Sequence, residues 1–425
     1  MKRVRMMLLG GLVAGASLGV AACGGSSSSS TSGGGGGGGG TVDIYSSLPL
    51  TGASTAQTKP MVNGIKLALD QAHNKAGQFS VSYTSLDDAT AQAGAWDPGQ
   101  CASNARKAAA DPNTVYYIGE FNSGCSEVTI PILNNAGIPQ VSPANTYVGL
   151  TKSAPGVTLP GEPEKYYPTG NRTYLRIVPT DSIQAAAGLM AMKQAGCTKV
   201  AVANDKEAYG TGLAALLEAE KGDYGVTITG NTGIDPKAPN FRSFASTVKS
   251  QGADCFYFAG IVSNGAVQLA KDINSALPNA KIFGGDGVCT SSYTNAKEGG
   301  VPASIAPKIE CTVATQDLHA YPGGKEFLAA YKAKYGVSNP DPYAIYGYED
   351  MKLGLDTIKS LGAQGSDKAA VLKALFAIKD RKSVLGTYGF DKDGDTTLKS
   401  YGLYKVGSDG NPLFVKSLTP PKVSG

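Results

Sequence analysis

The segment Val115-Tyr116-Tyr117-Ile118-Gly119-Glu120-Phe121-Asn122-Ser123-Gly124-Cys125-Ser126 decides the fold class. Its first four residues form a continuous apolar run, as in a strand of a parallel sheet that is covered on both faces. A loop of small and polar residues follows, and a helical stretch comes after it. Because units of this kind recur along the chain, the sequence predicts doubly wound α/β layers.

Other strands are expected on both sides of this unit. They are Val42–Ser47, Val81–Leu86, Ile138–Val141, Tyr174–Val178, Lys199–Ala203, Val226–Thr229, Cys255–Ala259 and Lys281–Phe283. After the first strand, one face of an amphipathic helix is formed by Met61, Ile65, Ala68, Leu69 and Ala72. Pro60 suits the first turn of this helix and Gly77 suits its end.

The chain is longer than one hydrophobic core usually organises, so two lobes are expected. Val42–Ser47 and Lys199–Ala203 each open a new run of strand–helix units. The sequence predicts two Rossmann-like, doubly wound lobes with a ligand cleft between them and three hinge crossings, near residues 180, 315 and 386. Lobe 1 would comprise residues 41–180 with 315–385, and lobe 2 residues 181–314 with 386–425.

The N-terminal residues predict export. Lys2, Arg3 and Arg5 precede an apolar stretch that ends in Val20-Ala21-Ala22-Cys23, which resembles a bacterial lipobox. We expect a lipoprotein signal peptide at residues 1–22, a lipid on Cys23, and a Gly/Ser-rich tether over residues 23–40. The protein would then be anchored by its lipid to the outer face of the cell membrane. The alternative is an ordinary secretory signal with a chance cysteine.

Charge and metal-binding residues exclude several classes of protein. Loss of the three N-terminal cations lowers the formal net charge from +4 to +1, which gives no reason to expect nucleic acid. The chain has two histidines, His73 and His319, and no Cys-x-x-Cys, so neither a metal nor another cofactor is expected. Asp391-Lys392-Asp393-Gly394-Asp395 matches a calcium loop poorly, and a surface hairpin turn is expected there.

Two loops are candidates for binding an anion. Residues 119–126 and Ser142-Pro143-Ala144-Asn145-Thr146 each follow a strand, and ligands of open α/β sheets bind at the carboxyl ends of the strands. The start of a helix also offers free N–H groups. Two such loops side by side could hold one carboxylate. The alternative for residues 119–126 is a plain capped loop between strand and helix.

The acidic candidates come from the second lobe. Asp181 begins a helical run, Asp286 lies in Gly284-Gly285-Asp286-Gly287 after a strand, and Tyr209 follows the strand Lys199–Ala203. Asp181 could instead be a helix N-cap with no ligand. Anion-binding backbone on one lobe and carboxylates on the other suit a zwitterion with ammonium and carboxylate on one carbon.

An ordered series of motifs resembles the leucine/isoleucine/valine-binding proteins, which are type I periplasmic binding proteins of ABC importers. The similarity runs from about residue 42 to residue 410. The motifs are Leu48–Gly52, Tyr116–Ser126, Ala136–Pro143, Asn204–Gly210 and Phe283–Gly287.

The resemblance implies roles for individual residues. Residues 123, 144 and 146 would hold the ligand carboxylate, and residues 181, 209 and 286 would surround its ammonium group. Tyr343 would line the side-chain pocket. Gln57 and Ile261 stand where the leucine-type receptors resemble one another in carrying tyrosines, and residues 152–172 look like an insertion. The positions are Ser123, Ala144, Thr146, Asp181, Tyr209, Asp286, Tyr343, Gln57 and Ile261.

With Cys23 lipidated, six cysteines remain, and they allow fifteen pairings. Sequence order and the resemblance favour Cys101–Cys125, Cys197–Cys255 and Cys289–Cys311, with Cys101 just before a helical stretch. Six unpaired buried thiols are the alternative.

The expected function is that of an extracytoplasmic, lipid-anchored substrate-binding protein of an ABC importer. It would bind a branched-chain or related amino acid between its lobes, as a monomer, and dock on the permease subunits of the transporter. The alternative is a sensory receptor lobe that binds an amide or another small polar solute. We expect no enzyme, because no motif places a base beside a nucleophile.

Overall fold

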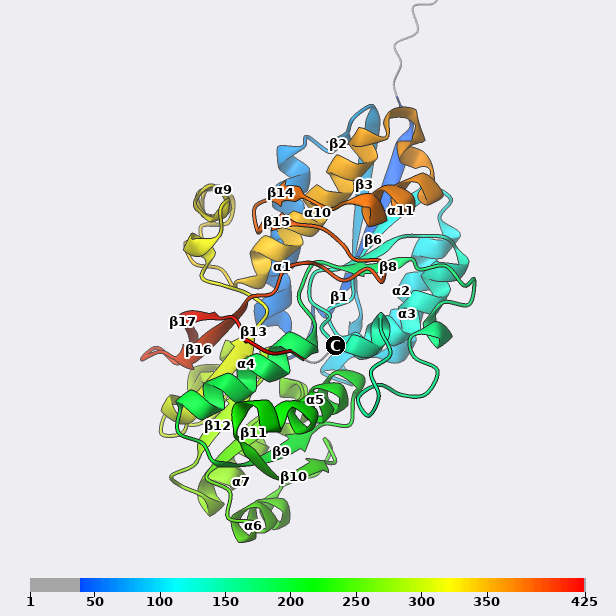
Figure 1. Ribbon diagram of the computed structural model, residues 1–425. Coiled ribbons are helices and arrows are strands. Elements are labelled where there is room, and N and C mark those ends of the chain that lie inside the picture. The colour runs from blue at the N-terminus through cyan, green and yellow to red at the C-terminus, as the bar shows by residue number, and fades with distance from the viewer. Residues whose placement is uncertain (1–38, 424–425) are drawn as a thin grey trace, which may run out of the picture. The chain divides into compact units, whose positions relative to one another are not determined.

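Two β-sheets organise the computed structural model, which describes residues 39–423. Figure 1 shows the sheets with helices beside them. The signal peptide, Cys23 and nearly all of the tether lie outside the described residues. Among the described residues, no helix is both long and apolar enough to cross a membrane.

The first sheet has six strands in the order β2-β3-β1-β6-β7-β8. Only the edge strand β2 runs antiparallel to its neighbour. Every residue of β6 is buried, as the apolar run predicts for a covered parallel strand. The strands are β1 (Thr41–Leu48), β2 (Lys75–Ala76), β3 (Phe79–Asp87), β6 (Thr114–Ile118), β7 (Gln140–Ser142) and β8 (Tyr174–Arg176).

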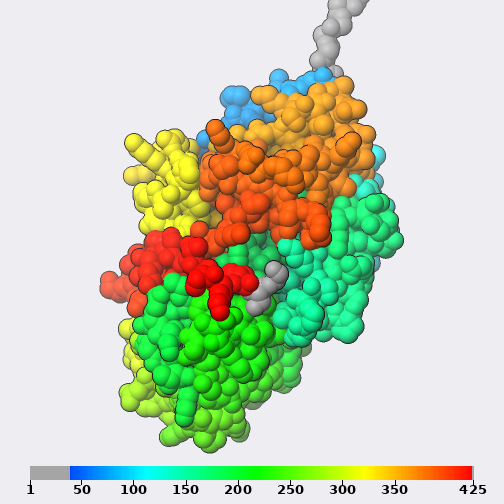
Figure 2. All heavy atoms as spheres, viewed as in Figure 1, coloured from blue at the N-terminus to red at the C-terminus, as the bar shows by residue number. Residues whose placement is uncertain are grey.

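The second sheet has seven strands in the order β10-β9-β11-β12-β13-β16-β17. Its first five strands are parallel, and the C-terminal strands β16 and β17 add an antiparallel edge. The strands are β9 (Lys199–Asn204), β10 (Thr227–Gly233), β11 (Cys255–Ala259), β12 (Lys281–Gly284), β13 (Ile309–Val313), β16 (Tyr401–Val406) and β17 (Pro412–Leu418). The C-terminal residues, red in Figure 2, lie against green residues of this lobe, where Lys422 pairs with Asp223.

Helices pack in pairs beside the sheets: α1 on α10, α2 on α3, α4 on α5, and α6 on α7. The helices are α1 (Thr55–Gln71), α2 (Pro98–Ala110), α3 (Ser123–Asn135), α4 (Asp181–Gln194), α5 (Ala208–Tyr224), α6 (Arg242–Ser250), α7 (Val267–Ala276), α8 (Ser291–Thr294), α9 (Gly324–Tyr335), α10 (Tyr343–Ser360) and α11 (Lys368–Ala377). Two small hairpins are β4–β5 (Ala89–Thr90, Ala95–Trp96) and β14–β15 (Arg381–Ser383, Gly386–Tyr388).

Helix α1 corrects two predictions about its ends. It begins at Thr55, so Pro60 lies inside the helix and not in its first turn. It ends at Gln71, well before Gly77, because His73 and Asn74 adopt left-handed backbone angles (φ 54° and 53°) that stop the helix. Gly77 instead occupies the turn between β2 and β3, at φ 61°.

The chain passes between the two sheets three times. It leaves the first sheet after β8, returns after β13 to place α10 on α1, and enters the second sheet again at β16. This is the predicted two-lobed α/β architecture. The described residues cluster as one unit, so the exact lobe boundaries at residues 180, 315 and 386 stay a prediction.

Candidate ligand-binding site

Two loops meet at the carboxyl ends of β6 and β7, as expected for neighbouring parallel strands. The Ser142 hydroxyl accepts hydrogen bonds from the N–H groups of Ala144 (3.1 Å) and Asn145 (2.8 Å) and donates to the Glu120 carbonyl (2.7 Å). Asn145 Nδ2 donates to the carbonyl of Phe121 (2.8 Å). These bonds fix the loop after β7 against the loop after β6.

The start of α3 faces the second of these loops. Ser123 is the first residue of the helix, and its hydroxyl accepts from the Tyr147 N–H at 3.4 Å. Ser123, Ala144 and Thr146 are all buried. The first N–H groups of a helix have no partner within the helix, and the helix dipole favours negative charge at this end. The arrangement suits a carboxylate.

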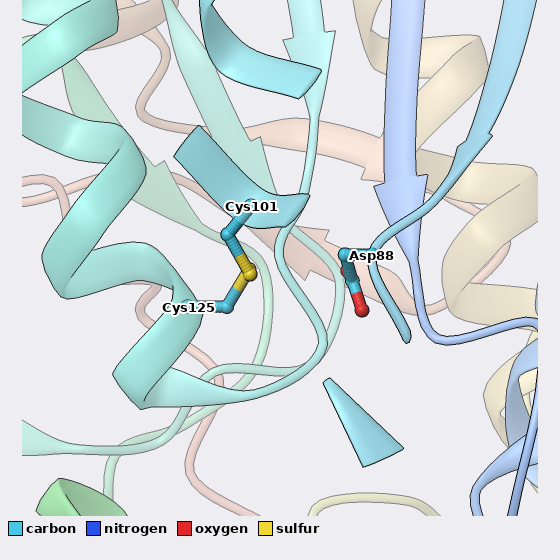
Figure 3. A group of neighbouring side chains, drawn as sticks. All are labelled: Asp88, Cys101 and Cys125. Atoms are coloured by element: carbon cyan, nitrogen blue, oxygen red, sulfur yellow. A yellow bond between two sulfur atoms is a disulfide. The ribbon is translucent and has the colours of Figure 1, made fainter. Parts of the chain in front are cut away.

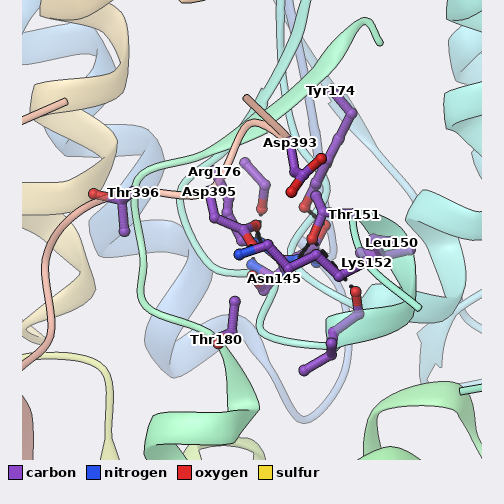
Figure 4. Close-up of polar contacts among 12 residues, drawn as sticks. Asn145, Leu150, Thr151, Lys152, Tyr174, Arg176, Thr180, Asp393, Asp395 and Thr396 are labelled. Atoms are coloured by element: carbon purple, nitrogen blue, oxygen red, sulfur yellow. Dashed lines mark hydrogen bonds and ion pairs between the residues drawn. The ribbon is translucent and has the colours of Figure 1, made fainter. Parts of the chain in front are cut away.

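Arg176, at the end of β8, holds the same loop from the other side, as Figure 4 shows. Its side chain is fully buried, and one terminal nitrogen donates to the carbonyls of Asn145 (3.2 Å) and Tyr147 (2.7 Å). Its Nε pairs with Asp395 at 2.7 Å. Lys152 completes the cluster through Asp395 (3.1 Å) and Asp391 (2.8 Å).

The expected hairpin turn at residues 391–395 is present, since Phe390 and Thr396 form an antiparallel bridge and the Asp391 N–H donates to the Asp395 carbonyl (2.9 Å). Lys392 is exposed at the surface, but the end of the turn is buried. Asp395 is only 4% exposed, and its backbone forms a bridge with Arg176 of β8. Arg176 and Lys152 hold the pKa of the Asp395 carboxyl below its usual range despite burial. The buried end of this surface turn therefore links the first sheet to the approach to β16.

Asp286 lies in a short turn directly after β12 and is surrounded by neutral donors. Its Oδ1 accepts from the Tyr209 hydroxyl (2.7 Å) and from Gln184 Nε2 (2.8 Å), and its Oδ2 accepts from the Tyr343 hydroxyl (2.9 Å). Gln57 Nε2 donates to its backbone carbonyl at 3.3 Å. Burial raises the pKa of Asp286, although these hydrogen bonds oppose the shift.

Asp181 is the first residue of α4 and is fully buried, and neither of its carboxyl oxygens has a hydrogen-bond partner among the described residues. The N-cap position belongs to Thr180, and Asp181 makes no capping bond, so the capping alternative is wrong. Its N–H donates to the Thr146 carbonyl (2.8 Å), which places Asp181 beside the anion-binding loop. Burial, and then the charge of Asp286, raise the pKa of Asp181 well above its usual value, although the nearby Thr146 side chain and the charge of Arg176 oppose the shift.

A small cavity of about 20 Å³ lies where these groups meet. Six of the expected residues line it: Ser123, Ala144, Thr146, Tyr209, Ile261 and Asp286. Asp181, Gln57 and Tyr343 are not among its lining residues. Asp181 adjoins the cavity through Thr146, to whose carbonyl its N–H donates, and Gln57 and Tyr343 adjoin it through Asp286. A volume near that of one water molecule means that an organic ligand enters only when the lobes or these side chains move apart.

Three residues of this region were not predicted. Gln184 lies three residues after Asp181 on α4, a spacing that places both on one helix face and could have revealed it. Glu207 lines the cavity, and it accepts hydrogen bonds from Trp96 Nε1 (3.1 Å) and Asn264 Nδ2 (2.8 Å). Trp96 belongs to the hairpin β4–β5 of the first lobe, and no periodic pattern marks it.

The structure contains three disulfides, Cys101–Cys125, Cys197–Cys255 and Cys289–Cys311, the pairs that the resemblance implies. Cys101 lies inside α2 and not before a helix, so its bridge joins α2 to the first turn of α3 (Figure 3). Asp88 lies beside this bridge, and Asp254 lies beside Cys197–Cys255. Cysteines in disulfides offer no thiolate, so neither group is a metal site.

Comparison with known proteins identifies the family. The model of the periplasmic binding protein family matches residues 41–411. The chain is 29% identical over 366 residues to the Leu/Ile/Val-binding protein BraC3 of Rhizobium johnstonii, covering 84% of this chain and 89% of the relative.

Solved structures share the fold. The leucine binding protein LivK of Thermotoga maritima matches with a TM-score of 0.75 and 22% identity, covering 89% of this chain and 99% of that one. A solute binding protein of R. palustris in complex with benzoate matches with a TM-score of 0.72 and 18% identity, covering 90% and 98%. Since the family model spans nearly all the described residues, this chain belongs to the periplasmic binding protein family and is a substrate-binding protein, not an enzyme.

Proposed function

We propose that this protein binds an α-amino acid, branched-chain or related, between its two lobes and delivers it to an ABC importer. One observation carries the proposal. The carboxyl group of Asp181 is fully buried without a hydrogen-bond partner, next to a loop and helix start that suit a carboxylate. An α-amino acid supplies an ammonium group and a carboxylate on the same carbon.

Ser123, Ala144 and Thr146 would bind the ligand carboxylate. The support is the helix start at Ser123 and the loop that Ser142 and Arg176 hold against it. Backbone N–H groups held in this way bind an anion without a cationic side chain, as helix N-termini do.

Asp181 would pair with the ligand ammonium group, together with Asp286 and the Tyr209 hydroxyl. Charge-assisted hydrogen bonds are about twice as strong as neutral ones. The ammonium group would also lower the pKa of Asp181, which burial now raises, and so restore its charge. Gln57, Tyr343 and Ile261 would face the side chain of the ligand.

The printed names of the relatives suggest two classes of ligand. The relative from Rhizobium johnstonii is a Leu/Ile/Val-binding protein, and one fold neighbour holds benzoate. Benzoate carries a carboxylate but no cation, so it would leave Asp181 buried and unpaired. The unpartnered carboxyl group therefore favours an amino acid.

An importer receives its solute on the outer side of the membrane, so the protein would act outside the cytoplasm. A lipid on Cys23 would hold it at the membrane, and the permease subunits of the importer would be its partner. Replacing Cys23 by Ser should release the protein from the membrane fraction, because the lipid would be its anchor. A Cys23→Ser variant that still sediments with membranes would show that the lipobox prediction is wrong.

The ligand class is tested by calorimetry of the purified protein against the α-amino acids. Each is paired with its deaminated acid and its decarboxylated amine, so that leucine is compared with 4-methylpentanoate and 3-methylbutylamine. We expect one amino acid to bind at one-to-one stoichiometry and both of its partial analogues to bind at least tenfold more weakly. Equal binding of a deaminated acid, or of benzoate, would contradict the role of Asp181.

A further inference from the structure

A second, larger cavity of about 550 Å³ lies next to the candidate site. Gln57 and Tyr343 both line it, and both contact Asp286, which lines the small cavity. The two cavities are therefore neighbours, separated by the contacts of these two side chains with Asp286. A volume of this size is typical of sites that enclose a whole small molecule.

The lining of the large cavity is acidic. It includes Glu298, Asp317, Asp341 and Asp409, and no Lys, Arg or His is among its described lining residues. Apart from the exposed His319 beside Asp317, no cationic side chain among the described residues pairs with any of the four. Their partners are mostly neutral: Asp341 accepts from the Tyr343 N–H (2.9 Å), and Glu298 accepts from the Ser291 hydroxyl (2.6 Å).

Aromatic rings complete the wall. Tyr343, Tyr404 and Phe414 line the cavity, and the rings of Tyr404 and Phe414 pack edge to face with centroids 5.5 Å apart. Aromatic faces attract cations through the ring quadrupole, and carboxylates attract them through charge. The alkyl part of a long side chain would also be buried favourably against these rings.

We propose that the ligand is an α-amino acid with a long, positively charged side chain, which passes Gln57 and Tyr343 and ends in the 550 Å³ cavity near Asp341. This inference rests on the proposed function, because the α-amino and carboxylate groups would remain in the small cavity. It makes the side-chain charge, and not branching, the basis of selectivity.

The state of Asp341 agrees with this inference. Burial raises the pKa of the Asp341 carboxyl to about 7, and its hydrogen bond from the backbone of Tyr343 opposes the shift. A cation within a few ångströms favours the ionised form of a carboxyl group. A cationic ligand would therefore supply the positive charge beside Asp341 that no other described residue provides.

The test compares lysine with norleucine, which has the same carbon skeleton without the terminal ammonium group. Calorimetry of the purified protein should show lysine binding at least tenfold more tightly. Asp341→Asn should reduce this preference at least fivefold, by weakening the binding of lysine more than that of norleucine. The matched control is Glu326→Gln, an exposed acid at the start of α9 outside the cavity, which should leave the preference intact.

The outcomes separate the two proposals. If norleucine or leucine binds as tightly as lysine, or if Asp341→Asn leaves the preference unchanged, the cationic side chain is wrong and the amino-acid function stands. If no α-amino acid binds, the proposed function itself is wrong, and the inference that rests on it is wrong too. Thermal unfolding checks that Asp341→Asn is folded, and Asp317→Asn provides a second variant in the same wall.

Discussion

The two lobes contribute different kinds of chemical group to the candidate site. The first lobe contributes a helix start and the backbone of two loops. The side chains of Ser142, Asn145 and Arg176 hold these loops in place by hydrogen bonds to backbone carbonyl groups. The half contributed by the second lobe consists of side chains, and its central carboxyl group, Asp181, has no hydrogen-bond partner. The supports of the first half are hydrogen-bonded without a ligand, whereas the central carboxyl group of the second half is not.

This difference indicates where selectivity arises. A preformed backbone site accepts any carboxylate that fits, whether of an amino acid or of benzoate. A buried carboxylate without a partner carries a desolvation cost, which is avoided by protonation or offset by a cationic ligand group. The raised pKa of Asp181 expresses this cost, since its neutral form is favoured until a cation arrives. The acidic half therefore distinguishes an amino acid from a simple acid.

The largest expected effect comes from breaking the support of the backbone half. Arg176→Met would leave Asp395 buried with Lys152 as its remaining cation and would free the carbonyls of Asn145 and Tyr147. Removing one partner of a buried pair costs about 3–5 kcal/mol, so chemical denaturation should show a loss of stability of this order.

The double variant Arg176→Met/Asp395→Asn provides the control. It removes the buried carboxylate that has lost Arg176 and keeps only Lys152, so it should be more stable than the single variant. Both variants should bind amino acids more weakly, because the loop at residues 144–147 loses its brace in both. A double variant no more stable than Arg176→Met would show that the ion pair is not what the single substitution breaks.

The next effect comes from the acidic half. Asp181→Asn should weaken amino-acid binding at least tenfold, because losing one partner of a desolvated charge pair costs roughly 2–5 kcal/mol. The same substitution should raise the unfolding temperature of the ligand-free protein, since it removes a buried ionisable group without a partner.

Asp286→Asn is the matched comparison within the same site. It should also weaken binding, but it should lower the unfolding temperature, because Asp286 already accepts three side-chain hydrogen bonds in the absence of ligand. Calorimetry and thermal unfolding of both variants check the pair. Unchanged affinity in Asp181→Asn would remove Asp181 from the ammonium site.

Much of the fold could be predicted because its signals are local. Apolar runs identified β6 and β11 closely, and β11 (Cys255–Ala259) has the predicted ends. The ends of α1 could not be predicted from propensity, because Pro60 is accommodated inside the helix and the left-handed angles at His73 and Asn74 end it early. The role of Asp395 depends on Arg176, more than 200 residues away in sequence, and no local pattern contains that pairing.

In the candidate site too, features with a local sequence signal could be predicted, and features that depend on tertiary contacts could not. Six expected residues line the small cavity because each follows a strand or starts a helix, positions that the α/β topology brings to one place. The tertiary contacts of Trp96 with Glu207 and of Gln57 with Asp286 join the two lobes and have no signature in sequence. The same holds for the large cavity, whose acidic residues come from four separate segments.

The smallest expected effect concerns the contact between Trp96 and Glu207, which links the two halves. Burial and then the charge of Asp205 raise the pKa of Glu207 to about 7 from its usual 4.5, although Asn264 and Trp96 donate hydrogen bonds to it. A carboxyl group whose pKa is raised in the folded protein stabilises it fully below the unfolded pKa, and this contribution is lost as the pH rises through the folded value. Glu207 should therefore reduce stability progressively between pH 5 and pH 8.

Glu207→Gln should flatten that decline, and the unfolding temperature should fall by about 2 °C less over this interval than in the wild type. Thermal unfolding at four pH values, followed through the fluorescence of Trp96, the one tryptophan in the sequence, checks this. The titration of Asp205 changes with that of Glu207, because the two carboxyl groups interact, whereas the more distant carboxyl groups titrate alike in both proteins and cancel. Equal slopes would show that this pair is not a source of the pH dependence.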